Sequence, residues 1–187
     1  MSQSATLRRS RIAGVGHYVP ERVIKNADLE PIMDTSDAWI QERTGIRERR
    51  WFEEGKDTTS NMGTAAAQRA LAMAGIAASE IELIIFATLS PDYVFPGSGV
   101  LTQRQLGISD VPCLDVRNQC SGFIYALSVG DQFIRTGMYN NVLVIGSEIH
   151  SSGLDISTRG RAVSVIFGDG AGAVVLRPAE RADQGIL

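Results

Sequence analysis

The sequence is poor in the features that mark secreted, membrane-spanning and nucleic-acid-binding proteins. Its two cysteines, Cys113 and Cys120, are too few for a disulfide framework, and their spacing matches no common zinc-binding pattern. The longest apolar runs, such as Leu83–Ala87, fall far short of the ~20 residues that cross a bilayer. A net charge of −3 lacks the basic excess of a phosphate-binding domain. The sequence therefore predicts free thiols in a reducing cytoplasm, with no membrane, metal or nucleic-acid partner.

The two ends of the chain add little to this pattern. Met1–Arg11 holds no apolar stretch of about 7–15 residues, so we expect no secretory signal there. At the other end, Gln184 and Gly185 are followed by Ile186 and Leu187, which are typical of the start of a further strand. We therefore expect the chain to be cut at this point rather than finished.

Short apolar runs alternate with helical segments along the 187 residues, of which 44% are apolar and 21% charged, as in an ordinary globular domain. We expect strands at Arg11–Val19, Ile81–Thr88, Val111–Val116, Asn141–Ile149 and Ala171–Leu176, and helices at Thr35–Arg43, Thr58–Ala74, Ser98–Leu106 and Ser121–Thr136. The strands at 81–88, 111–116 and 141–149 are apolar enough to be buried. The alternation predicts an α/β domain with a mixed, mostly parallel sheet and helices on both faces.

Cys120 lies in the stretch DVRNQCSGF, where a predicted strand turns into an apolar helix. A helix start offers unpaired N–H groups and a positive dipole end, which favour the thiolate. The small residues Ser121 and Gly122 allow a substrate to approach the sulfur, so the position suits acyl transfer through a thioester. Position alone leaves a second interpretation open, because most free cysteines are simply small buried side chains. That second role is the one we expect for Cys113, inside a strand.

Trp39 and Arg43 are four residues apart on one predicted helix and therefore project from the same face. Together they can clamp a flat heterocycle with a phosphate, or Trp39 can simply pack on the arginine stem. The only histidines are His17, near the end of a predicted strand, and His150, which follows one, and we expect surface or structural roles for both. A cysteine nucleophile usually has a base partner, and the sequence offers no evident one.

Four stretches in register resemble the β-ketoacyl-acyl-carrier-protein synthase III family: Asp34–Arg50, Cys120–Gly137, Ser157–Ala162 and Phe167–Leu176. The resemblance runs from about Arg11 to the end of the chain. It implies that residues 1–187 form the amino-terminal domain of a thiolase-like fold, with the helix from Cys120 buried at its centre. It also implies that a homologous carboxy-terminal domain, which holds the family's catalytic His and Asn, is absent from this chain.

The resemblance also implies a role for each matching residue. Cys120 would accept an acyl group from acyl-CoA, and its N–H would be one oxyanion donor. The acyl-enzyme would then condense with malonyl-acyl-carrier-protein, which releases CO₂ and a β-ketoacyl product. CoA would be bound as a substrate thioester rather than a permanent cofactor. The CoA contacts implied are Thr35, Trp39, Arg43 and Arg159, and Phe95 would reach across a homodimer to close the partner's acyl pocket.

The polar triplet Arg117-Asn118-Gln119 departs from the small residues that usually precede the family's cysteine. A similar polar triplet occurs in relatives such as the condensing enzyme of alkylquinolone biosynthesis. The stretch Leu89–Pro96 resembles those relatives as much as the acetyl-CoA-specific enzymes. The acyl group is therefore left open between acetyl, medium-chain and aromatic. Two other functions also stay open: transfer of the acyl group to a hydroxyl or amine, and a non-catalytic binding or dimerisation half.

Overall fold

The computed structural model describes residues 8–181 and 183–186. Of the prediction for Met1–Arg11, the part on residues 1–7 therefore lies outside the described residues, as does Leu187. The further strand expected near the end of the chain is not formed within residues 183–186. Ile186 N–H nevertheless donates a hydrogen bond to the carbonyl of Ser10, at the start of the first strand, at 2.8 Å.

A five-stranded sheet forms the body of the protein, in the order β1-β7-β6-β4-β5. The strands are β1 (Ser10–Tyr18), β4 (Leu83–Ala87), β5 (Cys113–Val116), β6 (Val142–Glu148) and β7 (Gly170–Pro178). Strand β4 is parallel to both of its neighbours, and β7 is antiparallel to both of its own. Only β7 therefore opposes the other four strands, which confirms the expected mixed, mostly parallel sheet.

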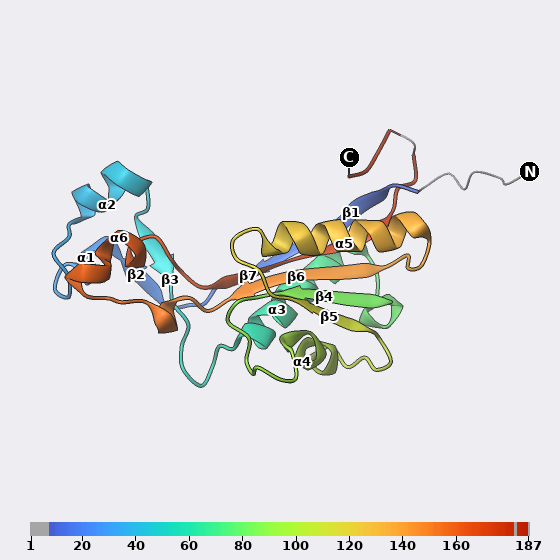
Figure 1. Ribbon diagram of the computed structural model, residues 1–187, viewed down its shortest axis with the longest axis horizontal. Helices are drawn as coiled ribbons and strands as arrows, with labels where there is room; N and C mark the ends of the chain where they lie inside the picture. Colours follow the sequence, from blue (N-terminus) through green and yellow to red (C-terminus); the bar gives the residue numbers. More distant parts are fainter. Residues whose placement is uncertain (1–7, 182, 187) are drawn as a thin grey trace, which may run out of the picture.

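Side chains of the central strands alternate between two apolar layers, as a buried strand requires. Ile84 and Phe86 pack against α3 (Thr59–Ala74), with α4 (Ser98–Gln105) beside it. Leu83 and Ile85 pack on the opposite face against α5 (Gly122–Thr136). Figure 1 shows the sheet between these helices, so the expected cover on both faces is confirmed.

The helices predicted from Thr35 and Thr58 begin two residues and one residue later, because the residue before each helix is its cap. Ser36 accepts a hydrogen bond from Trp39 N–H ahead of α2 (Asp37–Thr44), and Thr58 caps α3 in the same way. Each of the two helices ends at a glycine with positive φ, +72° at Gly45 and +67° at Gly75.

The prediction that residues 111–116 form a buried strand is wrong. Strand β5 lies at the edge of the sheet, and Leu114 is 40% exposed. An apolar run four residues long does not reveal whether its strand has one neighbour or two.

A smaller lobe lies at the other end of the molecule from the carboxy-terminal end of α5 (Figure 1). It contains the two-stranded sheet of β2 (Val23–Lys25) and β3 (Glu48–Arg50), with α1 (Asn26–Leu29), α2 and α6 (Arg161–Ser164) around a separate apolar cluster. The sequence analysis missed this sheet, because three-residue strands are too short for an alternation pattern. Buried Arg49 ties the lobe together through the carbonyls of Ile24 and Val165 at 3.2 and 2.9 Å. Burial lowers the pKa of Arg49 below its usual value.

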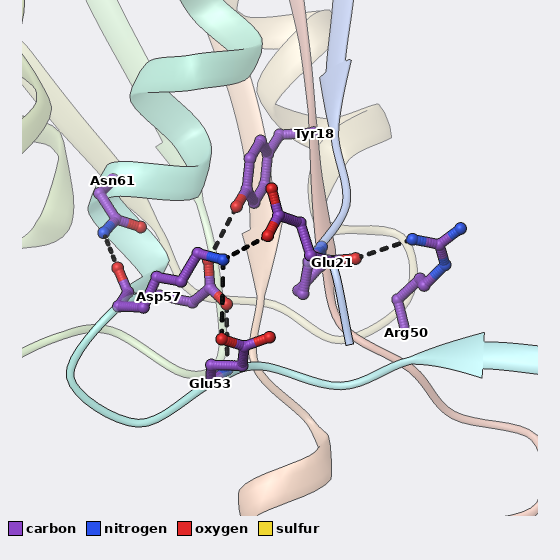
Figure 2. A network of polar contacts seen from close by, with 8 residues as sticks. Tyr18, Glu21, Arg50, Glu53, Asp57 and Asn61 are labelled. Carbon is purple, nitrogen blue, oxygen red and sulfur yellow. Dashed lines mark hydrogen bonds and ion pairs between the residues drawn. The ribbon is translucent and has the colours of Figure 1, made fainter. Parts of the chain in front are cut away.

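A polar network holds the segment before α3 against the end of β1, as Figure 2 shows. The hydroxyl of Tyr18 donates to Asp57 at 2.9 Å, and the other carboxylate oxygen of Asp57 accepts from Glu53 N–H at 3.0 Å. Lys56 forms an ion pair with Glu21 at 2.6 Å. Burial of the phenol and the bond to Asp57 raise the pKa of Tyr18. The network thereby positions the segment that leads into α3.

Candidate active site

Cys120 lies in the turn that joins β5 to α5, two residues before the helix begins at Gly122. The turn is closed by a hydrogen bond of 2.7 Å from Gly122 N–H to the carbonyl of Gln119. The first main-chain bond of the helix follows, from Tyr125 N–H to the carbonyl of Ser121 at 3.0 Å. The expected position at the mouth of an apolar helix is confirmed, and Cys120 is exposed.

Only one face of α5 is covered by the body of this chain. Ala126 and Ile134 pack on the sheet, whereas Ile124 and Tyr125 are 63% and 56% exposed. The arrangement that the resemblance implies, a central helix buried on all sides, is therefore not present within the described residues.

A cavity of about 270 Å³ opens beside Cys120 at the carboxyl ends of β4 and β6. Parallel strands of α/β sheets place binding sites at this edge. The cavity is lined by Ala87, Leu89, Asn118, Gln119, Cys120, Gly122, Phe123, Gly146, Ser147, Glu148, His150 and Phe167. The sulfur thus sits in the wall of a largely apolar pocket that is open to a substrate.

The two histidines differ in their relation to this cavity. His17 is exposed on β1, which agrees with the surface role expected for it. His150 lines the cavity, and its ring packs against that of Phe167 at a tilted angle, with centroids 5.0 Å apart. Sequence reasoning missed this neighbour of Cys120, because the two residues come together only through the pairing of β6 with β4.

The segment that carries His150 is anchored by Asp169, which follows the glycine at 168. One oxygen of this buried carboxylate accepts from the N–H groups of His150 and Ser151 at 2.7 and 2.8 Å. The other accepts from Phe52 N–H at 2.7 Å. Asp169, directly before β7, therefore joins three chain segments.

Cys113 occupies a different environment from Cys120. It is half-buried in β5, and its thiol lies 3.6 Å from the carbonyl of Val111. Burial, followed by the nearby charge of Asp115, raises the pKa of Cys113 to about 11. Its thiol therefore stays protonated at neutral pH, in agreement with a structural role.

In the small lobe, two guanidinium groups lie against the indole of Trp39. The Arg43 group is 4.4 Å from the ring centroid and the Arg161 group 4.8 Å, both within the range of cation–π contacts. Arg161 is held by the carbonyl and the carboxylate of Asp34. The N–H of Asp34 in turn donates to the hydroxyl of Thr158 at 2.9 Å.

Arg159 does not join this group in the described structure. Its side chain is 89% exposed and pairs with Asp155 at 2.8 Å. Hydrogen bonds from Ser157 and then Arg159 lower the pKa of Asp155 to about 2. The turn Thr158–Gly160 directs Arg159 outward, and Arg161, two residues later, occupies the place beside Trp39.

The other predicted site residues are placed as follows. The hydroxyl oxygen of Thr35 is buried and has no hydrogen-bond partner within the described residues. Phe95 is 90% exposed in the loop between β4 and α4, next to Val94 with the same exposure. This loop forms an apolar projection beside a second cavity of about 820 Å³, whose lining includes Arg117, Tyr93 and Asp92.

Comparisons with known proteins agree with this arrangement. The family model described as 3-Oxoacyl-[acyl-carrier-protein (ACP)] synthase III matches residues 114–187. The beta-ketoacyl-[acyl-carrier-protein] synthase III of Rhizorhabdus wittichii is 50% identical over 181 residues, which are 97% of this chain and 56% of that protein. The chain spans about half the length of the curated relatives it matches.

Solved structures give the same result. The 3-oxoacyl-[acyl-carrier-protein] synthase III from Aquifex aeolicus superposes with a TM-score of 0.88 at 48% identity, covering 92% of this chain and 55% of that one. The priming β-ketosynthase from the R1128 polyketide biosynthetic pathway superposes with a TM-score of 0.89 at 35% identity, covering 96% and 53%. These matches show the thiolase-like fold, and over nearly its whole length the chain is similar to one half of the β-ketoacyl-[acyl-carrier-protein] synthase III proteins.

Proposed function

We propose that the chain supplies the nucleophile of an acyl-CoA-primed condensing enzyme. The Cys120 thiolate attacks the thioester carbonyl, a new bond forms between sulfur and the acyl carbon, and CoA leaves as its thiol with the proton given up by Cys120. The Cys120 N–H, in the turn before α5, is one donor to the oxyanion that forms on the way. The observation that carries the proposal is an exposed thiol at a helix start in the wall of a cavity.

The second step of the reaction is condensation with malonyl-acyl-carrier-protein, with loss of CO₂. The chain has only His17 and His150, and the family resemblance assigns the decarboxylating His and Asn to a second, homologous domain. We propose that residues 1–187 are the amino-terminal domain of such a two-domain enzyme. The coverage of relatives, 56% of the first protein compared, supports this division.

We propose that the small lobe binds the adenine nucleotide of CoA at Trp39, with Thr35 and Arg43 beside it. Arg161 takes the role that the sequence motif assigned to Arg159, because Arg161 is the arginine at the indole. The unpartnered hydroxyl of Thr35 supports a polar contact with the ligand. CoA enters as a substrate thioester, and the reaction needs no resident cofactor.

We further propose that the protein acts as a homodimer in the cytoplasm. The loop that carries Phe95 exposes two large apolar side chains at 90%, which supports burial against a second copy. No helix within residues 8–181 and 183–186 is long and apolar enough to cross a membrane. The two free cysteines agree with a reducing compartment.

Mass spectrometry of the full-length protein with a panel of acyl-CoAs tests the proposal. We expect an acyl adduct on Cys120 with at least one of the acetyl, medium-chain or aromatic thioesters, and a β-ketoacyl product once malonyl-acyl-carrier-protein is added. An adduct that passes to a hydroxyl or amine acceptor would instead identify a different acyltransferase. The absence of any adduct would reject the nucleophile and leave a binding half.

A further inference from the structure

Glu148, the last residue of β6, makes an unusual set of contacts beside the Cys120 cavity. Its carboxylate accepts hydrogen bonds from all three residues that follow β4. One oxygen accepts from Leu89 N–H at 2.8 Å. The other accepts from the Ser90 hydroxyl at 2.6 Å, Ser90 N–H at 3.2 Å and the Thr88 hydroxyl at 3.3 Å. One side chain therefore holds the whole segment Thr88–Ser90.

This segment separates the two cavities. Leu89 lines both the 270 Å³ cavity of Cys120 and the 820 Å³ cavity beside it, and Ser90 lines the larger one. The sheet no longer holds the chain here, because the bond from Thr88 N–H to Val116 at 3.2 Å is the last to a neighbouring strand. The position of the wall therefore depends on Glu148, on the bond from Ile149 N–H to the Ser90 hydroxyl and on the bond from the Thr59 hydroxyl to the Ser90 carbonyl.

The contacts of Glu148 are all with uncharged groups. Glu148 takes part in none of the ion pairs among the described residues. Four neutral hydrogen-bond donors stabilise its carboxylate instead. Both carboxylate oxygens of Glu148 are therefore engaged with the segment Thr88–Ser90. The other titratable side chains at this cavity are Cys120 and His150.

We propose that Glu148 is a positioning residue, which fixes Thr88–Ser90 as the wall of the Cys120 cavity and thereby limits the width of the group that can reach the sulfur. The claim that this wall selects among acyl groups rests on the proposed function. The claim that Glu148 fixes the position of the wall rests on its hydrogen bonds alone.

Alkylation of Cys120 by a narrow and a wide reagent tests the wall directly. The rates with iodoacetamide and N-phenylmaleimide are measured on the Cys113→Ser protein with and without Glu148→Gln. The amide keeps the size of the side chain but replaces one acceptor oxygen with a donor, which opposes the N–H groups of the segment. We expect the preference for the narrow reagent to fall about tenfold, the scale of losing one hydrogen bond to a charged group.

Glu82→Gln is the matched control at the opposite end of the same strands. Glu82 accepts from the N–H groups of Asn140 and Asn141, so it too joins two segments through a carboxylate. The preference should be unchanged in this variant. An unchanged preference in Glu148→Gln, or an equal fall in both variants, would overturn the proposal.

Ser90→Ala provides a test if Glu148→Gln does not fold, because it removes only the hydroxyl that lies between Glu148 and Ile149. We expect a fall of about threefold, and no change would contradict the role of the segment. Alkylation needs no acyl-CoA, so the wall is tested even if the protein forms no acyl-enzyme. If it does form one, Glu148→Gln should shift acylation toward wider acyl groups, and an unshifted panel would overturn that part.

Discussion

Cys113 and Cys120 are seven residues apart, and the fold gives them opposite properties. Cys113 is held in β5, half-buried, where its thiol keeps its proton. Cys120 lies in the turn after the same strand, exposed beside a cavity and two residues before a helix. The difference shows that a turn at the carboxyl end of a parallel strand, rather than the residue type, makes a thiol available for chemistry.

The largest expected difference between the two cysteines is in acyl-enzyme formation, measured after each is replaced by alanine. In the full-length protein, Cys120→Ala should abolish the acyl adduct that mass spectrometry detects with acyl-CoA, because no other thiol lines the cavity. Cys113→Ala should leave the adduct in place. An adduct that survives in Cys120→Ala and disappears in Cys113→Ala would reverse the assignment.

Alkylation at different pH values sharpens the same contrast. Because the folded pKa of Cys113 is about 11, only about a thousandth of it is thiolate at pH 8, and its labelling should rise about a hundredfold between pH 8 and 10. Cys120 should be labelled first at pH 8. Peptide mapping after timed iodoacetamide treatment measures both rates. Equal labelling at pH 8 in the folded protein would contradict the difference, and equal labelling is expected only after unfolding.

Arg159 and Arg161 in the small lobe also differ in position: the side chain of Arg159 is exposed, whereas Arg161 lies against Trp39. Arg161→Ala should raise the KM for acyl-CoA about tenfold, because it removes a cation at the face of Trp39. It should not change the KM for the matching acyl-pantetheine, which has no adenine. Arg159→Ala is the control, and the exposed side chain predicts no effect on either substrate. A larger effect from Arg159 would restore the assignment made from the motif.

The smallest expected effect concerns stability at the sheet edge. Cys113 pairs in register with Ile84 of β4, and the side chain of Ile84 is fully buried. Cys113→Ala should lower the free energy of unfolding by about 1 kcal/mol, whereas Ile84→Ala should lower it by about 2–5 kcal/mol. Urea unfolding monitored by circular dichroism compares the two. Similar losses would show that β5 is as well packed as β4.

Elements with local signals were predicted well from the sequence. The helices α2 and α3 carry a capping side chain at one end and a glycine with positive φ at the other, so a few neighbouring residues determine where they begin and end. The strands β4 and β6 carry enough apolar residues to identify them. The pair β2 and β3 carried no such signal, and the exposure of β5 depends on its place in the sheet rather than on its own residues.

The candidate site was predicted only where one segment contains the whole arrangement. The mouth of α5 at Cys120 and the pair Trp39 and Arg43 each lie within a few residues of chain. His150 and Glu148 were not expected near Cys120, because the sheet brings β6 beside β4 across more than fifty residues. Arg161 was missed because a short turn decides which of two neighbouring arginines faces the indole.

By itself, the sequence determined the alternation of strands and helices, the cysteine at a helix start and the resemblance to a family, since periodicity, caps and motifs are local properties of the chain. Only the tertiary structure decided which side chains surround the sulfur and the indole. Such neighbours depend on strand order and on the direction of a turn, and these follow from the packing of the whole sheet.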